Sequence, residues 1–488
     1  MISIGIDCGT QSLKAIALDA ESGEILASAS QSYGMISNLS AGHMEQDPGV
    51  WIEALEISVQ KVLKKIENRK SEVLAFGVSG QQHGFVPLDS ENRVIRPAKL
   101  WCDTSTTAQC DQIRNHFGGR SPLIELIGND VLPGFTAPKI LWLKQNEPEN
   151  FKKLHTVLLP HDYLNWYLTS KFFMEYGDAS GTALLDVRKR SWSDPLIDFI
   201  DIDLRRKLPT LQSSLIPGGF LNASLAKSWG LSSNVVISAG GGDNMMGAIG
   251  TANLEKGIVT ASLGTSGTIF SYSDTPIIDP QGEIAAFCDS TNGWLPLLCT
   301  MNVTIVTEAL SRMFEWNHQQ LAEEIDSIPV GSDGLLLLPF LQGERTPNLP
   351  QGCGTFHGLT LKNMTKAHFA RATMEGITFG MAYGLGRLRE LGIIANEIRL
   401  TGGGSRNSVW RQICADIFNV PVVTLKNAEG AALGAALQAL SGVSSKSISE
   451  LTASLIRKDE STRAIPQQAE AYRVVKDGYN RILSKLYT

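Results

Sequence analysis

Asp243 follows three consecutive glycines, Gly240 to Gly242, directly after a short apolar segment at 235–239. The apolar segment predicts a buried strand, and the glycines would let the backbone beyond it come close to a ligand. A carboxylate held there could orient a hydroxyl group and accept its proton, as the transfer of a phosphoryl group to an alcohol requires. Asp243 could instead form an Asx turn or cap the helix predicted at 245–249, and that alternative is compatible with the catalytic role.

Two similar Gly-Thr segments occur in the two halves of the chain, IGIDCGTQSLK at 4–14 and ASLGTSGTIF at 261–270. Each predicts a strand, a turn and a second, alternating strand. Backbone N–H groups and the threonine hydroxyl, at Gly9-Thr10 and at Gly264-Thr265, could hold phosphate oxygens there. Either copy alone could be an ordinary hairpin. Two copies in register favour a pair of phosphate-binding turns.

The two copies differ at one position that bears on metal binding. Asp7 in the first copy corresponds to Ser262 in the second. Carboxylate oxygens are ligands that hard divalent cations prefer. The sequence therefore predicts a cation beside the first turn only.

Polar side chains follow two further apolar segments. Gln82 and His83 come after a predicted strand at 73–79, and Trp101 and Asp103 follow a second short segment. Side chains at the carboxyl ends of strands in an open α/β sheet line its usual ligand site. A lone histidine or tryptophan could equally be a core residue. The polar neighbours favour a site for a polyhydroxylated molecule, with the indole as a stacking face.

The elements that must position these residues alternate between strands and helices. At 488 residues the chain exceeds one core, and we predict two domains, 1–244 and 245–488. Helical spacing predicts helices at 51–68, 366–391 and 408–418, whereas short strands and turns at 165–219 indicate an insertion. The fold class is therefore α/β.

Composition excludes several classes of protein. The net charge of −6 argues against binding to nucleic acid or to a membrane surface and favours small-molecule partners. Seven scattered cysteines without CxxC spacing, no apolar run of ~18 residues and no basic leader predict a cytoplasmic protein with free thiols. The chain also has no P-loop, no protein-kinase catalytic motifs and no GxGxxG after its first strand.

An ordered set of motifs resembles the FGGY family of carbohydrate kinases, and within it the xylulokinase group. The set comprises IGIDCGTQSLK, EQDP at 45–48, SGQQHG at 79–84, PGFTAPKILWL at 133–143, LPHDYL at 159–164, GGGDN at 240–244, SLGTSG at 262–267, GERTP at 343–347 and TGGGSRN at 401–407. The segments 134–146 and 354–375 resemble the two family signatures. The resemblance spans nearly the whole chain.

The resemblance implies two ribonuclease H-like domains of the actin and hexokinase superfamily around a central catalytic cleft, with ATP and Mg²⁺ as cofactors. It implies that Asp243 is the general base and that Asp7 lies near Mg²⁺, partly through water. The implied sugar-side residues are Gln82, His83, Trp101, Asp103, Asp243 and Asn244. The implied ATP and phosphate residues are Thr10, Gln11, Ser12, Gly264, Thr265, Gly403, Gly404, Ser405 and Asn407.

Two departures from the group bear on the substrate. Gln82 stands where xylulokinases commonly carry Met, and Cys102 to Ser105 stand where they commonly carry Asn-Asp-Gly-Arg. The resemblance implies phosphorylation of the terminal hydroxyl of a ketopentose, D-xylulose first and D-ribulose, L-ribulose or another ketose or polyol next. A non-catalytic, ATP-driven switch of the same superfamily is the rival reading. A homodimer is the default assembly.

Overall fold

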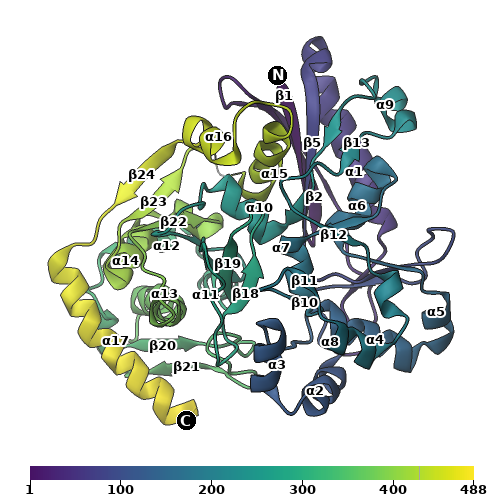
Figure 1. The fold of residues 1–488 in the computed structure, drawn as a ribbon. Helices are drawn as coiled ribbons and strands as arrows, with labels where there is room; N and C mark the ends of the chain where they lie inside the picture. Colours follow the sequence, from purple (N-terminus) through teal and green to yellow (C-terminus); the bar gives the residue numbers. More distant parts are fainter. Residues whose placement is uncertain (428, 488) are drawn as a thin grey trace. The chain divides into compact units, whose positions relative to one another are not determined.

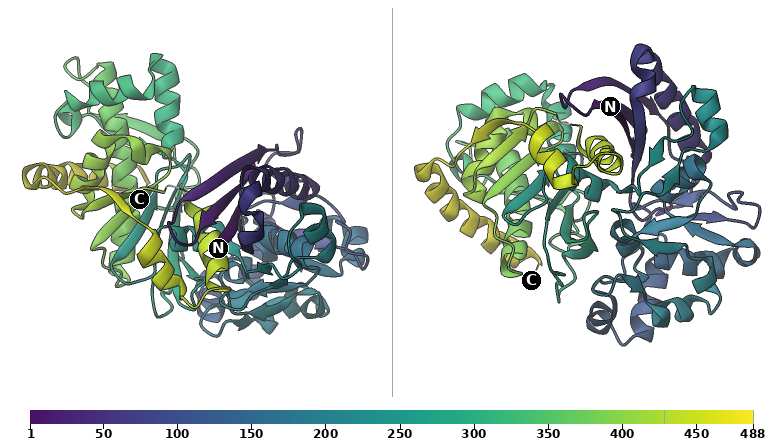
Figure 2. Two further views of the ribbon diagram at one scale, coloured as in Figure 1. Left: turned by 90° about the horizontal axis from the view of Figure 1, so that it is seen from above. Right: turned by 45° about the horizontal axis from the view of Figure 1, so that its top comes forward.

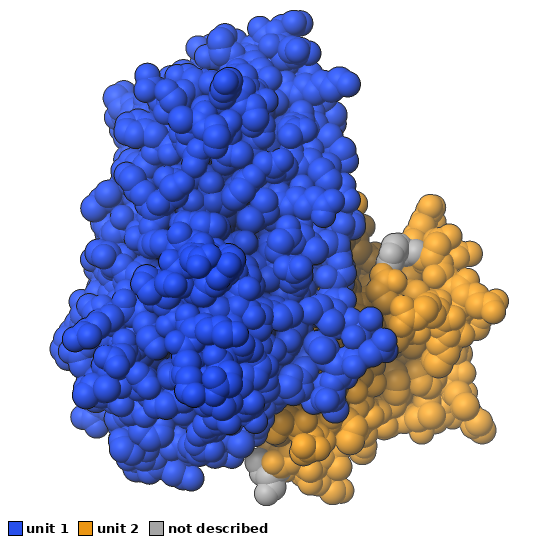
Figure 3. Space-filling view, turned by 90° about the vertical axis from the view of Figure 1, so that its right-hand side faces the viewer, with its two compact units in different colours: residues 1–254, 273–296, 429–456 blue, residues 255–272, 297–428, 457–488 orange. Residues whose placement is uncertain are grey.

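The computed structural model of the chain describes residues 1–427 and 429–487, apart from the side chain of residue 318. The chain packs as two compact units, which are coloured separately in Figure 3. Unit 1 consists of residues 1–254, 273–296 and 429–456, and unit 2 of residues 255–272, 297–428 and 457–488. Each unit is thus assembled from three separate stretches of chain. The domain boundary between residues 244 and 245 stays a prediction.

Unit 1 is built on a mixed sheet with the order β13-β14-β5-β1-β2-β3, and a short strand, β15, also pairs with β5. The strands β1 (Ile2–Cys8) and β2 (Ser12–Asp19) are antiparallel and joined by residues 9–11, which confirms the first predicted hairpin. The strands β1, β14 (Val236–Ile237) and β15 (Gly241–Gly242) run parallel to β5 (Val73–Gly80). The outer strands are β3 (Ile25–Ser32) and β13 (Gly219–Phe220).

Helices pack on both faces of this sheet. The helices α1 (Gly49–Lys65) and α6 (Pro160–Thr169) contact one another and the sheet, where Ile4 and Ile6 contribute to their shared core. Because side chains alternate along a strand, the intervening Gly5 faces the other side, against α15 (Gly430–Ser441). A Cβ atom on Gly5 would lie 1.9 Å from the Ala432 carbonyl oxygen. Figure 1 shows α15 beside β1 and β5, far from them in sequence.

The helix α10 (Asp243–Gly250) packs on the same α15. The backbones meet without intervening side chains, since a Cβ atom on Gly434 would lie 1.7 Å from the Met246 carbonyl oxygen. The first residue of α10 is Asp243. The helix that carries the predicted general base is therefore seated by a helix from the last part of the chain.

The remaining elements of unit 1 surround this core. They are β4 (Glu45–Gln46), η1 (Glu67–Glu72), β6 (Val86–Leu88), β7 (Ala98–Lys99), α2 (Thr107–His116), α3 (Arg120–Ile127), α4 (Thr136–Asn146), α5 (Pro148–Lys153), β8 (Thr156–Leu158), β9 (Phe173–Glu175), α7 (Tyr176–Ala179), η2 (Ser180–Thr182), β10 (Leu185–Asp186), β11 (Ser191–Trp192), α8 (Asp194–Ile200), η3 (Leu204–Lys207), β12 (Thr210–Gln212), α9 (Ala223–Trp229), β18 (Ala285–Cys288) and α16 (Ile448–Leu455). The segment 165–219, predicted as an insertion of short strands and turns, lies wholly in this unit.

Unit 2 contains a second sheet, in which strands follow the order β19-β17-β16-β22-β23-β24. The antiparallel pair β16 (Ile258–Ser262) and β17 (Gly267–Ser271) confirms the second predicted hairpin. The long helix α13 (Lys366–Glu390) is largely buried. Figure 2 gives two further views of the fold. The other elements are β19 (Trp294–Thr300), which starts within unit 1, α11 (Thr304–Phe314), α12 (His318–Asp326), η4 (Ser332–Gly334), β20 (Leu336–Pro339), β21 (Gly354–His357), α13 (Lys366–Glu390), β22 (Glu397–Thr401), η5 (Gly403–Arg406), α14 (Ser408–Phe418), β23 (Val422–Leu425), β24 (Lys458–Thr462) and α17 (Pro466–Tyr487).

The predicted helices are confirmed with small shifts at their ends. The helix predicted at 51–68 spans Gly49–Lys65 and is followed by η1, so the chain tightens into a 3₁₀ turn before β5. The helices predicted at 366–391 and 408–418 span Lys366–Glu390 and Ser408–Phe418. Among the described residues, no helix is both long and apolar enough to cross a membrane.

Candidate functional site

Three neighbouring strands of unit 1 end at one edge of the sheet. In the register of β5, Ser79 pairs with Asp7 of β1 on one side and with Gly241 of β15 on the other. Because all three strands are parallel, their carboxyl ends meet at this edge. The fold thus gathers Asp7, the segment that follows β5 and the start of α10 in one place, as the sequence predicts.

The Asp243 carboxylate is held by one oxygen. Its Oδ1 accepts hydrogen bonds from the backbone N–H of Asn244 at 2.8 Å and from Asn244 Nδ2 at 3.0 Å. Asn244 Nδ2 also donates to Gln82 Oε1 at 2.9 Å, which fixes the amide of Asn244 in turn. In the described part of the chain Asp243 Oδ2 has no hydrogen-bond partner. Gly242, rather than Asp243, is the N-cap of α10.

Asp7 presents a similar arrangement. Its Oδ1 accepts a hydrogen bond from Ser79 Oγ at 2.9 Å, and within residues 1–427 and 429–487 its Oδ2 has no hydrogen-bond partner. Desolvation raises the pKa of Asp7. Desolvation, together with the negative charges of Asp7 and Asp178, also raises the pKa of Asp243 to about 8. Two carboxylates that repel one another, each with one open oxygen, form an arrangement that a cation would stabilise.

The raised pKa of Asp243 predicts a pH-dependent stability in the absence of divalent cations and nucleotide. Between its ordinary pKa of 3.8 and about 8, the folded protein keeps a proton that the unfolded chain releases. The free energy of unfolding therefore decreases as the pH rises through this window. An Asp243→Asn protein lacks this loss. We expect its Tm advantage over the wild type to grow from pH 5 to pH 8 and to level off above, measured by calorimetry in EDTA. A constant difference in Tm would contradict the shift.

His83 is fixed by both its backbone and its ring. Its φ of 65° is left-handed. Its carbonyl oxygen accepts from Lys139 Nζ at 2.8 Å and from Thr136 Oγ1 at 3.2 Å. The ring packs against Phe135, and its Nδ1 lies 2.7 Å from the Gly181 carbonyl oxygen. A carbonyl oxygen can only accept, so Nδ1 carries a proton and donates to Gly181.

Lys139, for which no role was predicted from the sequence, stabilises this conformation of His83. Its side chain is fully buried, and Nζ also donates to the Gly134 carbonyl oxygen at 2.6 Å. Burial lowers the pKa of Lys139 to about 7, while the charge of Asp103 opposes that shift. The lysine therefore joins the start of α4 to the backbone of the histidine segment. A lysine within the apolar run PKILWL was the available signal.

For the sugar kinase that the motifs imply, we expect Lys139→Met to raise the KM for sugar by about tenfold or more, because the His83 carbonyl oxygen loses a buried hydrogen-bond donor. The KM for ATP should stay within about twofold of the wild type, since the hydrogen bonds of Lys139 Nζ to the described residues go to His83 and Gly134 of unit 1. Lys144→Met, on the same helix but partly exposed, is the matched control and should leave both constants unchanged. Equal increases in both constants would contradict a local role for Lys139.

The turn formed by Gly9, Thr10 and Gln11 in unit 1, which we predict to bind phosphate and call the phosphate turn, is held through its carbonyl groups. The Gly9 carbonyl accepts from Tyr33 Oη at 2.6 Å, that of Thr10 from Gln46 Nε2 at 2.7 Å, and that of Gln11 from the Tyr33 backbone N–H at 3.0 Å. Among the described residues, the backbone N–H groups of Thr10 and Gln11 have no acceptor. The turn therefore offers amide donors for an anion, as predicted from its glycine.

The hydroxyl of Thr10 is engaged differently from the expectation that it would hold phosphate. It accepts a hydrogen bond from Trp101 Nε1 at 3.0 Å and donates one to Gln81 Oε1 at 3.0 Å. Its only proton is therefore directed away from a ligand. The indole of Trp101 likewise has its N–H directed to the turn.

Asp103 is fully buried and does not present its carboxylate to a ligand. Its oxygens accept from the backbone N–H of Met44, from Lys99 Nζ, and from both the backbone N–H and Oγ of Ser105. A carboxylate has about four acceptor sites, and all are used. We therefore assign Asp103 to support of the Trp101 loop, which corrects the expected direct contact with sugar. A charged lysine four residues earlier was the signal for this ion pair.

The same lysine explains a group of potential metal ligands. His43, Glu45 and Asp103 are the group of three such residues found in the described chain. Lys99 Nζ already lies 3.1 Å from His43 Nδ1, 3.0 Å from Glu45 Oε1 and 3.1 Å from Asp103 Oδ2. The ammonium group satisfies these ligands, so the group is an ion-pair network rather than a metal centre.

In unit 2 the segments predicted to contact ATP also lie together. The strands β16 and β22 are parallel neighbours, and the Gly404 backbone N–H donates to the Leu263 carbonyl oxygen at 3.0 Å. A Cβ atom on Gly402 would lie 2.6 Å from the Leu263 carbonyl group, so only glycine allows this approach. The two segments contain Gly264, Thr265, Gly403, Gly404, Ser405 and Asn407. Among these, Asn407 Oδ1 accepts from the Trp410 backbone N–H at 3.0 Å and caps α14.

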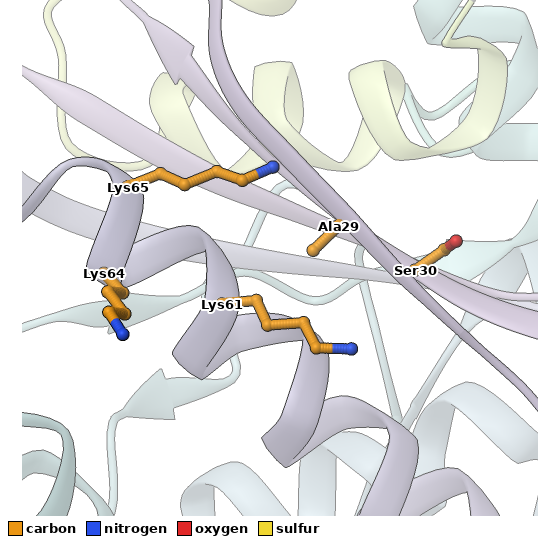
Figure 4. Close-up of a pocket in the computed structure, with 5 residues that line it drawn as sticks. All are labelled: Ala29, Ser30, Lys61, Lys64 and Lys65. Atoms are coloured by element: carbon orange, nitrogen blue, oxygen red, sulfur yellow. The ribbon is translucent and has the colours of Figure 1, made fainter.

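A separate hollow on the surface of unit 1 is lined by residues that we do not predict to act in catalysis or ligand binding. It encloses about 580 Å³ between α1 and β3 and is lined by Ala29, Ser30, Lys61, Lys64 and Lys65. Figure 4 shows the three lysines in the last part of α1, with Lys64 and Lys65 adjacent and Lys61 about one turn earlier. Lys65 Nζ donates to the Ser28 carbonyl and Lys61 Nζ to Gln31 Oε1, so two of the amines serve to bind the edge strand.

Comparisons with known proteins agree with this geometry. The family models "FGGY family of carbohydrate kinases, N-terminal domain" and "C-terminal domain" match residues 2–250 and 259–443. A xylulose kinase of Haemophilus influenzae is 41% identical over 99% of this chain and all of its own length. Structures of a ligand-bound xylulose kinase and of a gluconate kinase, both from Lactobacillus acidophilus, are each 26% identical with a TM-score of 0.93. They cover 99% and 100% of this chain and 98% of their own chains. The chain belongs to the FGGY family of carbohydrate kinases.

Proposed function

We propose that this carbohydrate kinase transfers the γ-phosphoryl group of ATP to the terminal hydroxyl of D-xylulose, giving D-xylulose 5-phosphate. The observation that carries the proposal is the identity of 41% with a xylulose kinase over essentially the whole length of both chains. Fold likeness alone would not choose the sugar, because a xylulose kinase and a gluconate kinase resemble the chain equally well.

Asp243 is the proposed general base. Its open Oδ2 accepts the proton of the sugar's terminal hydroxyl as the hydroxyl oxygen attacks the γ-phosphorus. The bond from the γ-phosphorus to the bridging oxygen breaks, and ADP leaves. Asn244 and Gln82 keep Oδ1 in place, so that the carboxylate does not rotate away from the nucleophile.

On the sugar side we propose that His83 and Trp101, which lie in the segments that follow β5 and β7, contact the sugar. Gln82 has a second amide proton besides the one directed to Met245 Sδ at 3.3 Å, and we propose that this proton meets a sugar hydroxyl. On the nucleotide side we propose the backbone N–H groups of Thr10 and Gln11 for phosphate oxygens. Ser12 and the segments of unit 2 at Gly264-Thr265 and Gly403 to Asn407 complete the proposed ATP contacts.

The residues present fit Mg²⁺, because Asp7 and Asp243 repel one another and each has an oxygen without a hydrogen-bond partner in the part of the chain that the structure describes. We propose that Asp7 would hold the ion, partly through water, where it would offset charge on the phosphates of ATP. All seven cysteines are free thiols, which supports a proposed reducing, cytoplasmic location. A homodimer remains our proposal for the assembly.

The direct test measures ADP release with Mg-ATP over D-xylulose, D-ribulose, L-ribulose, L-xylulose, glycerol, gluconate and no sugar. We expect D-xylulose to give the highest kcat/KM. Preference for another sugar would still support the kinase activity. It would indicate that Gln82 and the segment 102–105 determine which sugar is phosphorylated. ADP release that is independent of every sugar would favour the rival reading as an ATP-driven switch.

A further inference from the structure

The phosphate turn of unit 1 belongs to a closed ring of hydrogen bonds that the mechanism above does not use. Gln46 Nε2 donates to the Thr10 carbonyl oxygen at 2.7 Å, and Thr10 Oγ1 donates to Gln81 Oε1 at 3.0 Å. Gln81 Nε2 then donates to Gln46 Oε1 at 3.1 Å and closes the ring. Gln46 and Gln81 are both buried, whereas Thr10 is partly exposed.

Two tryptophans set the direction of every bond in this ring. Trp51 Nε1 donates to Gln46 Oε1 at 3.0 Å, so the amide nitrogen of Gln46 must face Thr10. Trp101 Nε1 donates to Thr10 Oγ1 at 3.0 Å, so the threonine proton must go to Gln81. An indole nitrogen can only donate, and both amide orientations follow from that. The hydroxyl of Thr10 and the amide nitrogens of Gln46 and Gln81 then each donate to an acceptor within the ring, which stabilises a buried network.

The ring joins the phosphate turn to the sugar side of the same unit. The backbone N–H of Gln81 donates to the Cys8 carbonyl at 2.8 Å, next to the turn, and Gln81 directly precedes the segment Gln82-His83. The side chain of Gln81 therefore fixes the position of Thr10 relative to Gln82 and His83, the two residues that we propose to bind sugar. A transfer to sugar needs the phosphate and the hydroxyl aligned to within a fraction of an ångström, whereas attack by water does not need the sugar segment.

We propose that Gln81 is a positioning residue, which through Thr10 and Gln46 holds the phosphate turn in register with the sugar segment and so favours transfer to sugar over hydrolysis. This inference rests on the proposed kinase function. It concerns residues whose contacts all lie within unit 1. It predicts a change in the ratio of two rates rather than a loss of binding.

The test compares sugar phosphorylation with sugar-independent ATP hydrolysis in Gln81→Met. We expect the ratio of the two kcat values to decrease by at least about tenfold, while the KM for the sugar stays within about twofold. Gln145→Met, at an exposed position of α4, is the control and should keep the wild-type ratio. If Gln81→Met fails to fold, Thr10→Val and Thr10→Ser give the same information, because only serine keeps both hydroxyl bonds. Valine should lower the ratio and serine should restore it.

Several results would overturn the proposal. In folded Gln81→Met, an unchanged ratio of the two kcat values would show that Gln81 has no positioning role. Equal losses of transfer and hydrolysis would show the same. Equal ratios in the valine and serine proteins would do the same. A wild-type protein that releases no ADP in response to any sugar would instead refute the kinase function itself, and the inference with it. The wild-type measurement therefore separates the two failures.

Discussion

Asp243→Ala is expected to lower kcat for sugar phosphorylation by about 10²–10⁴-fold, the usual contribution of a positioned general base. The carboxylate stands at the start of α10, where Oδ1 is held by Asn244 and Oδ2 has no hydrogen-bond partner among the described residues. The Kd for ATP, measured by calorimetry, should change by no more than about threefold, since the phosphate turn is held by other residues.

The matched control is Asp194→Ala. Asp194 is also the first residue of a helix, α8, but its side chain is exposed and makes only a long ion pair with Arg205. Its removal should leave kcat unchanged. Turnover of Asp243→Ala near that of Asp194→Ala would refute the assignment of the base.

Gly434→Ala should be unusually damaging for a change of one methyl group. The new Cβ atom would lie 1.7 Å from the Met246 carbonyl oxygen, so α10 and α15 must separate. Overpacking of this kind costs typically about 1–3 kcal/mol, which for a unit of about 300 residues should lower Tm by about 2–5 °C. The shift also displaces Asp243, and we expect kcat to decrease by about 10–100-fold.

Gly386→Ala is the control, for which we expect a change in Tm of the opposite sign. Gly386 lies within α13, and beyond the adjacent backbone of its own helix no atom of the described residues comes within 4 Å of the position of its missing Cβ. Alanine there should raise Tm slightly, because glycine costs about 1 kcal/mol in a helix interior. Similar Tm changes in the two variants would show that the contact at Gly434 is less close than described.

Local chemistry explains what could be predicted from the sequence. The hairpins at Gly9-Thr10 and Gly264-Thr265 follow from turn residues between alternating strands, and helices such as α14 follow from apolar spacing. The edge that gathers Asp7, Gln82 and Asp243 follows from the rule that ligands lie at the carboxyl ends of parallel strands.

Long-range contacts explain what could not be predicted. Nothing near Gly5 in the sequence indicates that Ala432 covers it. The Thr10 hydroxyl is taken up by Trp101 and Gln81, which lie more than 70 residues away, so its use could not be read from the turn itself. A side chain's type limits its possible partners, and only the fold selects one of them.

The return of α15 and α16 to unit 1 has a consequence for synthesis on the ribosome. The chain emerges from its N-terminus, so β1 and β5 are made long before the helix that covers the face bearing Gly5. The first unit cannot be completed as its own first stretch leaves the exit tunnel, although N-terminal domains usually fold first during translation. Until residue 441 has been added, the nascent chain carries a sheet with one uncovered face and an α10 without its packing partner, and residues 255–272 and 297–428 of unit 2 are translated in that interval. Apolar surface exposed for so long favours aggregation.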